Sequence, residues 1–190
     1  MLRIFAGKHR GRKLEVIDNK KLRPTAGRTR EAIFNILNHG RFAGDGQRFL
    51  EGSKVVDLFC GSGALGFEAL SHGAAHCVFI DIDQEHLSVV RGNAQHLGEE
   101  KNVTLIRSDS SSPPAAKFPC DLIFIDPPYH SNLIQAALKN LAARGWLRTG
   151  SVIVVEMDKR ENLPEVQGFQ PITERVYGRT RISLLEWATP

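Results

Sequence analysis

A glycine-rich stretch follows the first strongly apolar run of the chain and reads Asp57-Leu-Phe-Cys-Gly-Ser-Gly-Ala-Leu-Gly66. Gly61, Gly63 and Gly66 have the G-x-G-x-x-G spacing, which lets a backbone turn tightly and approach a ligand without a Cβ in the way. The run before the glycines is typical of a buried strand, and the residues after them are typical of a helix, whose N-terminus offers free N–H groups. The stretch therefore predicts a strand, a ligand-binding loop and a helix.

An acidic residue, Asp81, ends the next predicted strand, 20 residues after Gly61. A carboxylate at that place can accept hydrogen bonds from the ribose hydroxyls of an adenosine. Taken alone, this pair fits NAD, FAD or S-adenosylmethionine (SAM). Asp57 favours SAM, because a carboxylate inside the strand can meet the ammonium of an amino-acid moiety but repels a pyrophosphate. Asp109, after the third predicted strand, is expected to accept from the adenine amino group, with a turn-forming role left open.

The expected cofactor-binding residues lie at the ends of predicted strands or in the loops that follow them. They are Asp57, Phe59, Gly61, Ser62, Gly63, Gly66, Asp81, Ile82, Asp109, Ser110 and Asp126.

The region from Lys54 onward alternates between strand and helix patterns. The predicted strands cover residues 55–59, 77–82, 103–107, 122–126 and 151–156, and the predicted helices cover 65–71, 84–97 and 133–143. Several of these strands are apolar on both faces, which is typical of a parallel sheet covered by helices on both sides. Two further runs, 169–176 and 180–187, predict an antiparallel hairpin at the edge of the sheet.

A second motif, Asp126-Pro127-Pro128-Tyr129, ends the fourth predicted strand. Ligands of open α/β sheets bind beyond the carboxyl ends of the strands, so this motif should face the same crevice as the glycine loop. The Asp126 carboxylate and the Pro127 carbonyl can each accept one hydrogen of an exocyclic base amine, which directs the nitrogen lone pair toward the methyl group of SAM. Tyr129 offers a flat face for an unstacked base. We expect these four residues to be catalytic.

The first quarter of the chain is strongly basic. Residues 1–48 contain 12 Lys/Arg and 4 Asp/Glu, a net charge of +8, whereas residues 49–190 have a net charge of −4. Short β-prone runs at 2–5 and 14–17 flank a basic, glycine-containing segment and predict a hairpin, and a helix capped by Thr25 or Thr29 should follow. The pattern predicts a polyanion-binding extension, residues 1–48, joined to a catalytic domain, residues 49–190.

The whole pattern resembles a known family. Together with the two motifs, Arg3-Ile-Phe-Ala-Gly-Lys-His-Arg-Gly-Arg-Lys-Leu14, Leu22-Arg-Pro-Thr25 and Arg28-Thr-Arg-Glu-Ala-Ile-Phe-Asn35 are similar to the RsmD family of bacterial 16S rRNA guanine-N2 methyltransferases. The resemblance implies a Rossmann-like class I methyltransferase fold, α/β, with a mostly parallel seven-stranded sheet and an antiparallel C-terminal hairpin. It also implies SAM as cofactor, S-adenosylhomocysteine as product, and guanine 966 of 16S rRNA as target, within an assembled or partly assembled 30S subunit.

By the same resemblance, the basic extension would hold the RNA. The residues expected to contact RNA are Lys8, Arg10, Arg12, Lys13, Arg23, Thr25, Arg28 and Arg30. The family pattern often has Glu where this chain has Asp81, and either carboxylate can bind a ribose.

Three other readings stay open at this stage. An adenine-N6 methyltransferase of DNA or RNA would use the same Asp-Pro-Pro-Tyr chemistry. An NAD-dependent oxidoreductase would use the glycine loop but has no role for residues 126–129. A non-catalytic RNA-binding or ribosome-assembly module would leave Asp57, Asp81 and Asp126 without a purpose.

Compositional features add expectations about the setting of the protein. No stretch approaches the roughly 20 apolar residues of a membrane span, and the N-terminus lacks the apolar core of a signal peptide, so we expect a cytoplasmic protein. The three cysteines match no zinc pattern and are expected to be reduced. We expect no metal site, and a monomer.

Overall fold

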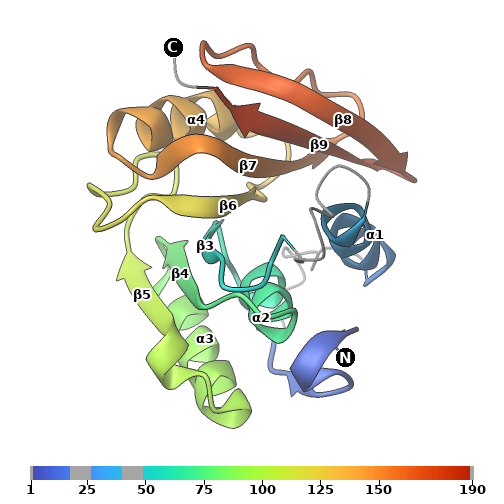
Figure 1. Cartoon of the computed structure of the whole chain (residues 1–190), viewed down its shortest axis with the longest axis vertical. Helices are drawn as coiled ribbons and strands as arrows, with labels where there is room; N and C mark the ends of the chain where they lie inside the picture. The colour runs from blue at the N-terminus through green and yellow to red at the C-terminus, as the bar shows by residue number, and fades with distance from the viewer. Residues whose placement is uncertain (1, 18–26, 40–48, 189–190) are drawn as a thin grey trace.

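The structure is a computed structural model, and it describes residues 2–17, 27–39 and 49–188. Its centre is a seven-stranded sheet with the order β5-β4-β3-β6-β7-β9-β8 (Figure 1). Five neighbouring strands run parallel and the two C-terminal strands are antiparallel, as the sequence predicts. The strands of this sheet are β3 (Lys54–Leu58), β4 (His76–Asp81), β5 (Val103–Arg107), β6 (Cys120–Ile125), β7 (Leu147–Asp158), β8 (Phe169–Tyr177) and β9 (Thr180–Trp187).

Four α-helices accompany the sheet in the described part of the chain. They are α1 (Gly27–Asn38), α2 (Ala64–Ser71), α3 (Gln84–Leu97) and α4 (Leu133–Ala143). Local chemistry sets the ends of α3, because the Asp83 side chain accepts a hydrogen bond from Glu85 N at its start and Gly98 adopts a left-handed conformation (φ 73°) at its end.

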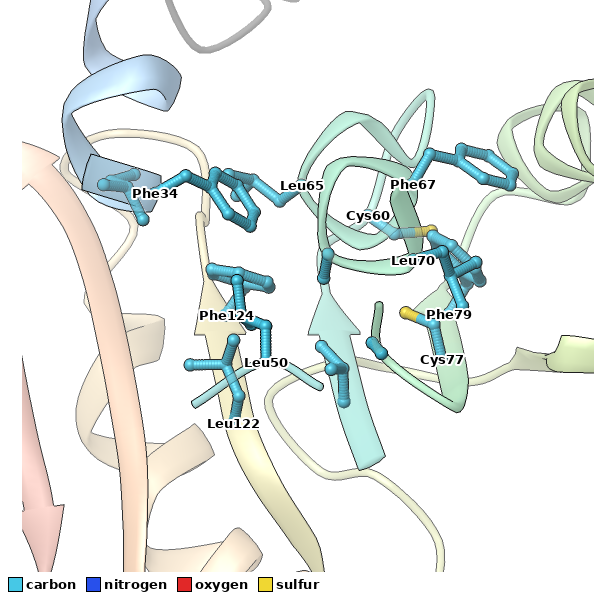
Figure 2. Close-up of a cluster of buried hydrophobic side chains, with 14 of the residues drawn as sticks. Phe34, Leu50, Cys60, Leu65, Phe67, Leu70, Cys77, Phe79, Leu122 and Phe124 are labelled. Atoms are coloured by element: carbon cyan, nitrogen blue, oxygen red, sulfur yellow. The ribbon is translucent and has the colours of Figure 1, made fainter. Parts of the chain in front are cut away.

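Side chains alternate between two apolar layers along the central strands. In β6, Leu122 and Phe124 face one layer, whereas Ile123 and Ile125 face the other. The first layer contains apolar residues of α1, α2 and α3, and the second contains those of α4, so helices cover both faces. Figure 2 shows part of the first layer, where Phe34 of α1 and Phe124 lie with ring centroids 5.8 Å apart.

The N-terminal segment forms the predicted hairpin, in which β1 (Leu2–Arg3) pairs with β2 (Lys13–Leu14). The hairpin lies against α2 (Figure 1), and Ile4 and Leu14 are buried in the same apolar layer as the helices. A Cβ at Gly7 would meet Ser71 O at 1.9 Å, so a glycine is needed where the hairpin backbone touches α2.

Several details differ from the sequence predictions. The bounds of most elements shift by one residue or more, and β7 covers Leu147–Asp158 where the prediction covered 151–156. Thr29 does not cap α1, because the helix begins at Gly27 and Thr29 is its buried third residue; Thr25 lies outside the described residues. The fourth parallel strand runs over Cys120–Ile125, so Asp126 follows the strand instead of ending it.

Candidate active site at the carboxyl ends of the strands

Asp57 fixes the glycine loop from inside β3. Its side chain is buried, and Oδ2 accepts a hydrogen bond from Gly66 N at 2.9 Å. A Cβ at Gly66 would come within 2.3 Å of the Phe79 ring, so only glycine lets α2 pack this closely on β4. The predicted strand–loop–helix unit is therefore present, and Asp57 connects its two ends.

The loop itself turns through left-handed conformations. Phe59, Gly61 and Gly63 have φ values of 59°, 51° and 76°. A positive φ is costly for phenylalanine and is tolerated mainly at functional sites. A Cβ at Gly61 would meet nothing within 4 Å, so the backbone faces open space there. An exposed loop backbone beside a helix N-terminus is suited to contact a bound cofactor.

Asp81 holds the other side of the loop. Its Oδ2 accepts from Gly61 N and its Oδ1 accepts from Asp83 N, both at 2.9 Å. His86 Nδ1 lies 3.0 Å from Oδ2. The carboxylate is thus fixed directly beside the glycine loop, where the ribose acceptor was expected.

Three carboxylates gather at the ends of β3, β4 and β6. Burial raises the pKa of Asp57 well above its usual value, the hydrogen bond from Gly66 opposes this rise, and the negative charges of Asp126 and Asp81 add to it. Such a concentration of negative charge attracts a cationic ligand and repels a pyrophosphate.

The predicted adenine-side residues divide into two kinds. Ile82 is 67% exposed, which leaves an apolar side chain open beside Asp81. Asp109 is exposed, but its Oδ1 accepts from Ser111 N and Ser111 Oγ, both at 2.8 Å, so one oxygen supports a turn.

Ser110 has a positioning role that the sequence did not indicate. It is buried, and its hydroxyl accepts from Phe59 N and donates to Ile80 O, both at 3.0 Å. Ser110 is one of the expected cofactor-binding residues, and the two hydrogen bonds of its hydroxyl go to the protein. Ser110 therefore ties the strained turn at Phe59 to β4.

The Asp-Pro-Pro-Tyr motif lies next to the glycine loop. Ile125 pairs with Leu58 across the parallel β3–β6 ladder, so Asp126 follows β6 at the same level as Phe59 follows β3. Asp126 is half-buried, Pro127 is buried and Pro128 is exposed. The two motifs, with 59 residues between them in the sequence, therefore meet at one edge of the sheet.

Tyr129 is anchored by partners on two later strands. Its hydroxyl donates to Glu156 Oε1 at 3.1 Å and is 2.8 Å from Thr180 Oγ1. Burial, together with the nearby Glu156 and Asp126 carboxylates, raises the pKa of Tyr129 to about 12, against the opposing effect of the Thr180 hydrogen bond. The ring is thus held as a neutral phenol in a fixed orientation. From the sequence, no role in the site was expected for Glu156. Its position, as a charged residue at the end of the apolar predicted strand 151–156, is the signal that could have indicated one.

The basic residues of the extension do not all face solvent. Five of the expected RNA-binding residues are exposed, namely Lys8, Arg10, Arg12, Lys13 and Arg28. Arg30 is 1% exposed, and its guanidinium bonds Glu68 and Arg3 O, so the expected RNA contact by Arg30 does not fit the structure. Arg23 and Thr25 lie outside the described residues.

Two negative findings apply to the described residues. They contain no group of three or more His, Cys, Asp or Glu side chains arranged to hold a metal ion. None of the helices among them has the length and apolar character needed to cross a membrane.

Comparisons with known proteins identify the family. The model described as "Conserved hypothetical protein 95" matches residues 2–186. The chain is 33% identical to ribosomal RNA small subunit methyltransferase D of Haemophilus influenzae, covering 93% of this chain and 89% of that protein. It is 36% identical to the Escherichia coli K12 protein of the same name, covering 87% and 79%.

Solved structures agree with this assignment. A putative methyltransferase, yhhF, from Escherichia coli superposes with a TM-score of 0.82 at 31% identity, covering 100% of this chain and 99% of that one. An RNA methyltransferase from Salinibacter ruber, solved with S-adenosyl-L-homocysteine, superposes with a TM-score of 0.67 at 15% identity, covering 88% and 95%, which supports the fold. The chain therefore belongs to the family described as conserved hypothetical protein 95, as an RsmD-type methyltransferase with the Rossmann-like class I fold.

Proposed function

We propose that this protein is a SAM-dependent rRNA methyltransferase that modifies an exocyclic base amine. The observation that supports this most strongly is the meeting of Asp57, Asp81 and Asp126 at adjacent strand ends, where the mutual repulsion of the charges contributes to the raised pKa of Asp57. A site of this kind suits a ligand with a sulfonium and an ammonium group. It does not suit the pyrophosphate of NAD, which the carboxylates would repel. An NAD-dependent oxidoreductase would also have no role for Tyr129.

The cofactor fits the residues that surround the glycine loop. Asp81 would accept from the ribose hydroxyls, the exposed Ile82 would cover one face of the adenine, and Asp109 would accept from the adenine amine. Asp57 would compensate the ammonium while it holds Gly66 N. When bound, SAM supplies a methyl carbon that is already activated by its sulfonium.

The chain's own residues would position the nucleophile. The Asp126 carboxylate and the Pro127 carbonyl would each accept a hydrogen of the base amine, so that the nitrogen lone pair points at the methyl carbon. Tyr129 would support the base on its ring face, since its hydroxyl is bound to Glu156 and Thr180. On transfer, the N–C bond would form as the methyl–sulfur bond breaks, S-adenosylhomocysteine would leave, and the amine would give one proton to Asp126 or to solvent.

The finer assignment is the exocyclic N2 of a guanine in 16S rRNA, at position 966, within the 30S subunit. The names of the relatives from Haemophilus influenzae and Escherichia coli support a small-subunit rRNA target. The Asp-Pro-Pro-Tyr motif alone leaves adenine-N6 as the alternative. We further propose that residues 1–48 form an RNA-binding extension to the catalytic domain, with Lys8, Arg10, Arg12, Lys13, Arg23, Thr25 and Arg28 toward the RNA.

The test is methyl transfer from labelled SAM to 30S subunits isolated from a strain that lacks this enzyme, followed by identification of the labelled nucleoside. We expect N2-methylguanosine from the wild type, and a loss of turnover of about 100-fold or more for Asp126→Ala at unchanged SAM affinity. Glu100→Ala, which removes an exposed carboxylate elsewhere, serves as the control.

Two outcomes would contradict the assignment. N6-methyladenosine as the sole labelled product would reject guanine. Full turnover by Asp126→Ala would reject the proposed amine acceptor.

A further inference from the structure

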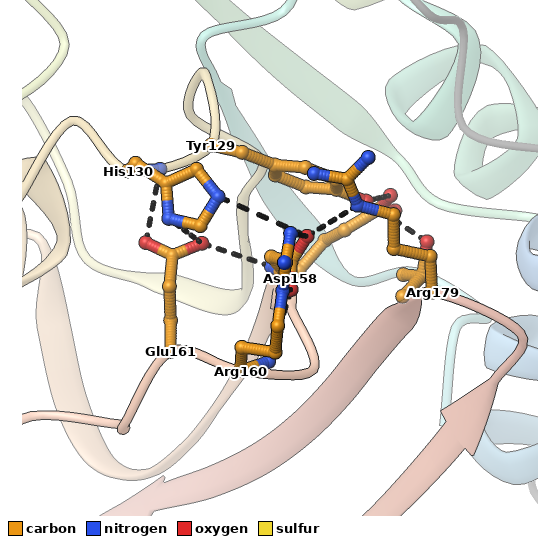
Figure 3. A network of polar contacts seen from close by, with 8 residues as sticks. Tyr129, His130, Asp158, Arg160, Glu161 and Arg179 are labelled. Atoms are coloured by element: carbon orange, nitrogen blue, oxygen red, sulfur yellow. Dashed lines mark hydrogen bonds and ion pairs between the residues drawn. The ribbon is translucent and has the colours of Figure 1, made fainter.

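Two arginines from separate segments converge on one buried carboxylate near Tyr129 (Figure 3). Arg160 follows β7, and its Nε lies 3.1 Å from Asp158 Oδ1. Arg179 lies in the turn between β8 and β9, and its Nε is 2.5 Å from Asp158 Oδ2. The Asp158 side chain is 0% exposed, whereas those of Arg160 and Arg179 are 65% and 54% exposed.

The outward charge of this cluster is positive. Lys159, Arg160 and Arg179 line one open depression together with Gly178. The second nearby carboxylate, Glu161, is only 18% exposed, and its oxygens accept from His130 N and Asp158 N, both at 3.0 Å. The acidic groups therefore face inward and support the loop, while the cations face solvent.

The arginines are held in place before any ligand arrives. Asp158 binds Arg179 through Nε, so this contact does not use the two η-nitrogens of a side chain that is 54% exposed. Hydrogen bonds with Arg160 and Arg179 hold the pKa of Asp158 well below its usual value, so the anchor stays charged. A guanidinium fixed in this way loses little conformational entropy when it binds a planar or tetrahedral oxyanion.

The cluster borders the site on the side of Tyr129. Thr180, which bonds the Tyr129 hydroxyl at 2.8 Å, directly follows Arg179 and pairs with Asp158 across the β7–β9 ladder. His130, which follows Tyr129, has Nε2 3.9 Å from Asp158 Oδ2. A nucleotide whose base lies on Tyr129 would have its own sugar–phosphate chain beside this cluster.

We propose that Lys159, Arg160 and Arg179 bind the phosphate backbone of the RNA next to the target nucleotide, an inference that rests on the function proposed above. These residues come more than 100 positions after the end of the basic N-terminal extension, so they add cations that the extension itself does not contain. Phosphate contacts set position and register without reading sequence. The cluster would thus place the unstacked base over Tyr129, while the residues around Asp126 and Tyr129 select which base is accepted.

The test compares Arg179→Gln and Arg160→Gln with Arg148→Gln. Arg148 is a matched control, because it is 61% exposed and paired with Asp121, and it lies near the start of β7, at the opposite end of that strand from Asp158. We expect each cluster variant to raise the KM for 30S subunits roughly tenfold. The slope of log K against log salt should fall by about 0.7 to 0.9 per charge removed.

Two further readouts separate RNA binding from other roles. SAM affinity and kcat at saturating 30S should stay within about twofold of the wild type, because only a phosphate contact is lost. Arg179→Lys keeps the positive charge and should keep most of the salt slope. Thermal unfolding of each variant checks that the fold is intact, and Arg148→Gln should match the wild type in every assay.

Several results would overturn the proposal. One is that Arg179→Gln and Arg160→Gln share the KM and salt slope of Arg148→Gln. Another is that kcat falls while KM stays constant, which would make the cluster a support for Tyr129 alone. If the wild type transfers no methyl group to 30S, the proposed function fails, and direct binding of a fluorescent 16S rRNA fragment by the same variants still decides whether these arginines bind RNA.

Discussion

Two arginine–carboxylate contacts join distant segments of this chain, and they differ in where they leave the positive charge. Arg30 and Glu68 have side chains 1% and 2% exposed, so both charges are inside the protein. At Asp158 the carboxylate is inside, while the guanidinium groups of Arg160 and Arg179 reach solvent. The family resemblance placed Arg30 at the RNA, but its side chain is buried against Glu68, whereas Arg179, to which no role was assigned from the sequence, reaches solvent. Packing, not composition, decides which cations are available to a partner.

The buried Arg30–Glu68 contact holds the N-terminal segment against α2. Glu68 of α2 accepts from Phe5 N and Ala6 N, each at 3.0 Å, and from Arg30 Nε at 3.3 Å. The Arg30 guanidinium also lies over the Phe5 ring, 4.6 Å from its centroid. Burial lowers the pKa of Arg30 and raises that of Glu68, and their mutual attraction opposes both shifts.

The largest expected effect comes from breaking this inner contact. Arg30→Ala removes the buried guanidinium that faces the buried Glu68 carboxylate, which should lower the free energy of unfolding by about 3 to 5 kcal/mol. Chemical denaturation measures the change. Arg28→Ala, at an exposed position of the same helix, should change it by less than about 0.5 kcal/mol. Equal effects of the two variants would mean that Arg30 is not the structural residue of the pair.

A smaller effect should appear in the pH dependence of SAM binding. The pKa of Asp57 is raised in the free protein, and a cationic ligand favours the ionised carboxylate, so binding should release a proton. Affinity should therefore rise with pH, by up to about tenfold per unit, until Asp57 is ionised without ligand. Calorimetric titration across pH values measures this. Asp57→Asn keeps an acceptor for Gly66 N, and its affinity should lose that slope.

The pH dependence measured with Asp57→Asn shows whether Asp57 is the group that releases the proton. A slope that persists unchanged in Asp57→Asn would assign the proton to another group. Binding of RNA phosphates to Lys159, Arg160 and Arg179 should draw no such slope from Asp158 near neutral pH, since the pKa of that carboxyl is already held low by its arginines.

The smallest effect is expected at the hairpin. Lys8 is 49% exposed and contacts the buried Glu99 at 2.6 Å, and Glu99 also has His9 and Asn102 as partners. Lys8→Ala should therefore cost at most about 1 kcal/mol, and less at high salt. Thermal unfolding at two salt concentrations checks it. A loss of stability as large as that of Arg30→Ala would show that the solvent exposure of an ion pair does not predict its contribution to stability in this protein.

The sequence predicts the fold and the meeting of the two motifs well, because both depend on local patterns. The bounds of α3, α4, β5 and β9 match the predicted ranges, since caps, glycines and apolar periodicity mark them. The glycine loop and Asp126 meet because parallel neighbouring strands end at one edge.

What could not be predicted involves partners far apart in the chain. Arg30 is buried by Glu68, which is 38 residues away, and Tyr129 is fixed by Thr180, which is 51 residues away. The hydroxyl of Ser110 supports Phe59 across 51 residues. No spacing rule links such pairs, because their contact follows from the packing of whole elements.

A crystal structure of the protein with S-adenosylhomocysteine would show whether the cofactor and Asp126 meet at the strand ends. We expect the ribose hydroxyls at Asp81, the adenine beside Ile82 and the sulfur facing Asp126. An adenosine bound away from the glycine loop, or an Asp126 carboxylate turned away from the sulfur, would contradict this expectation.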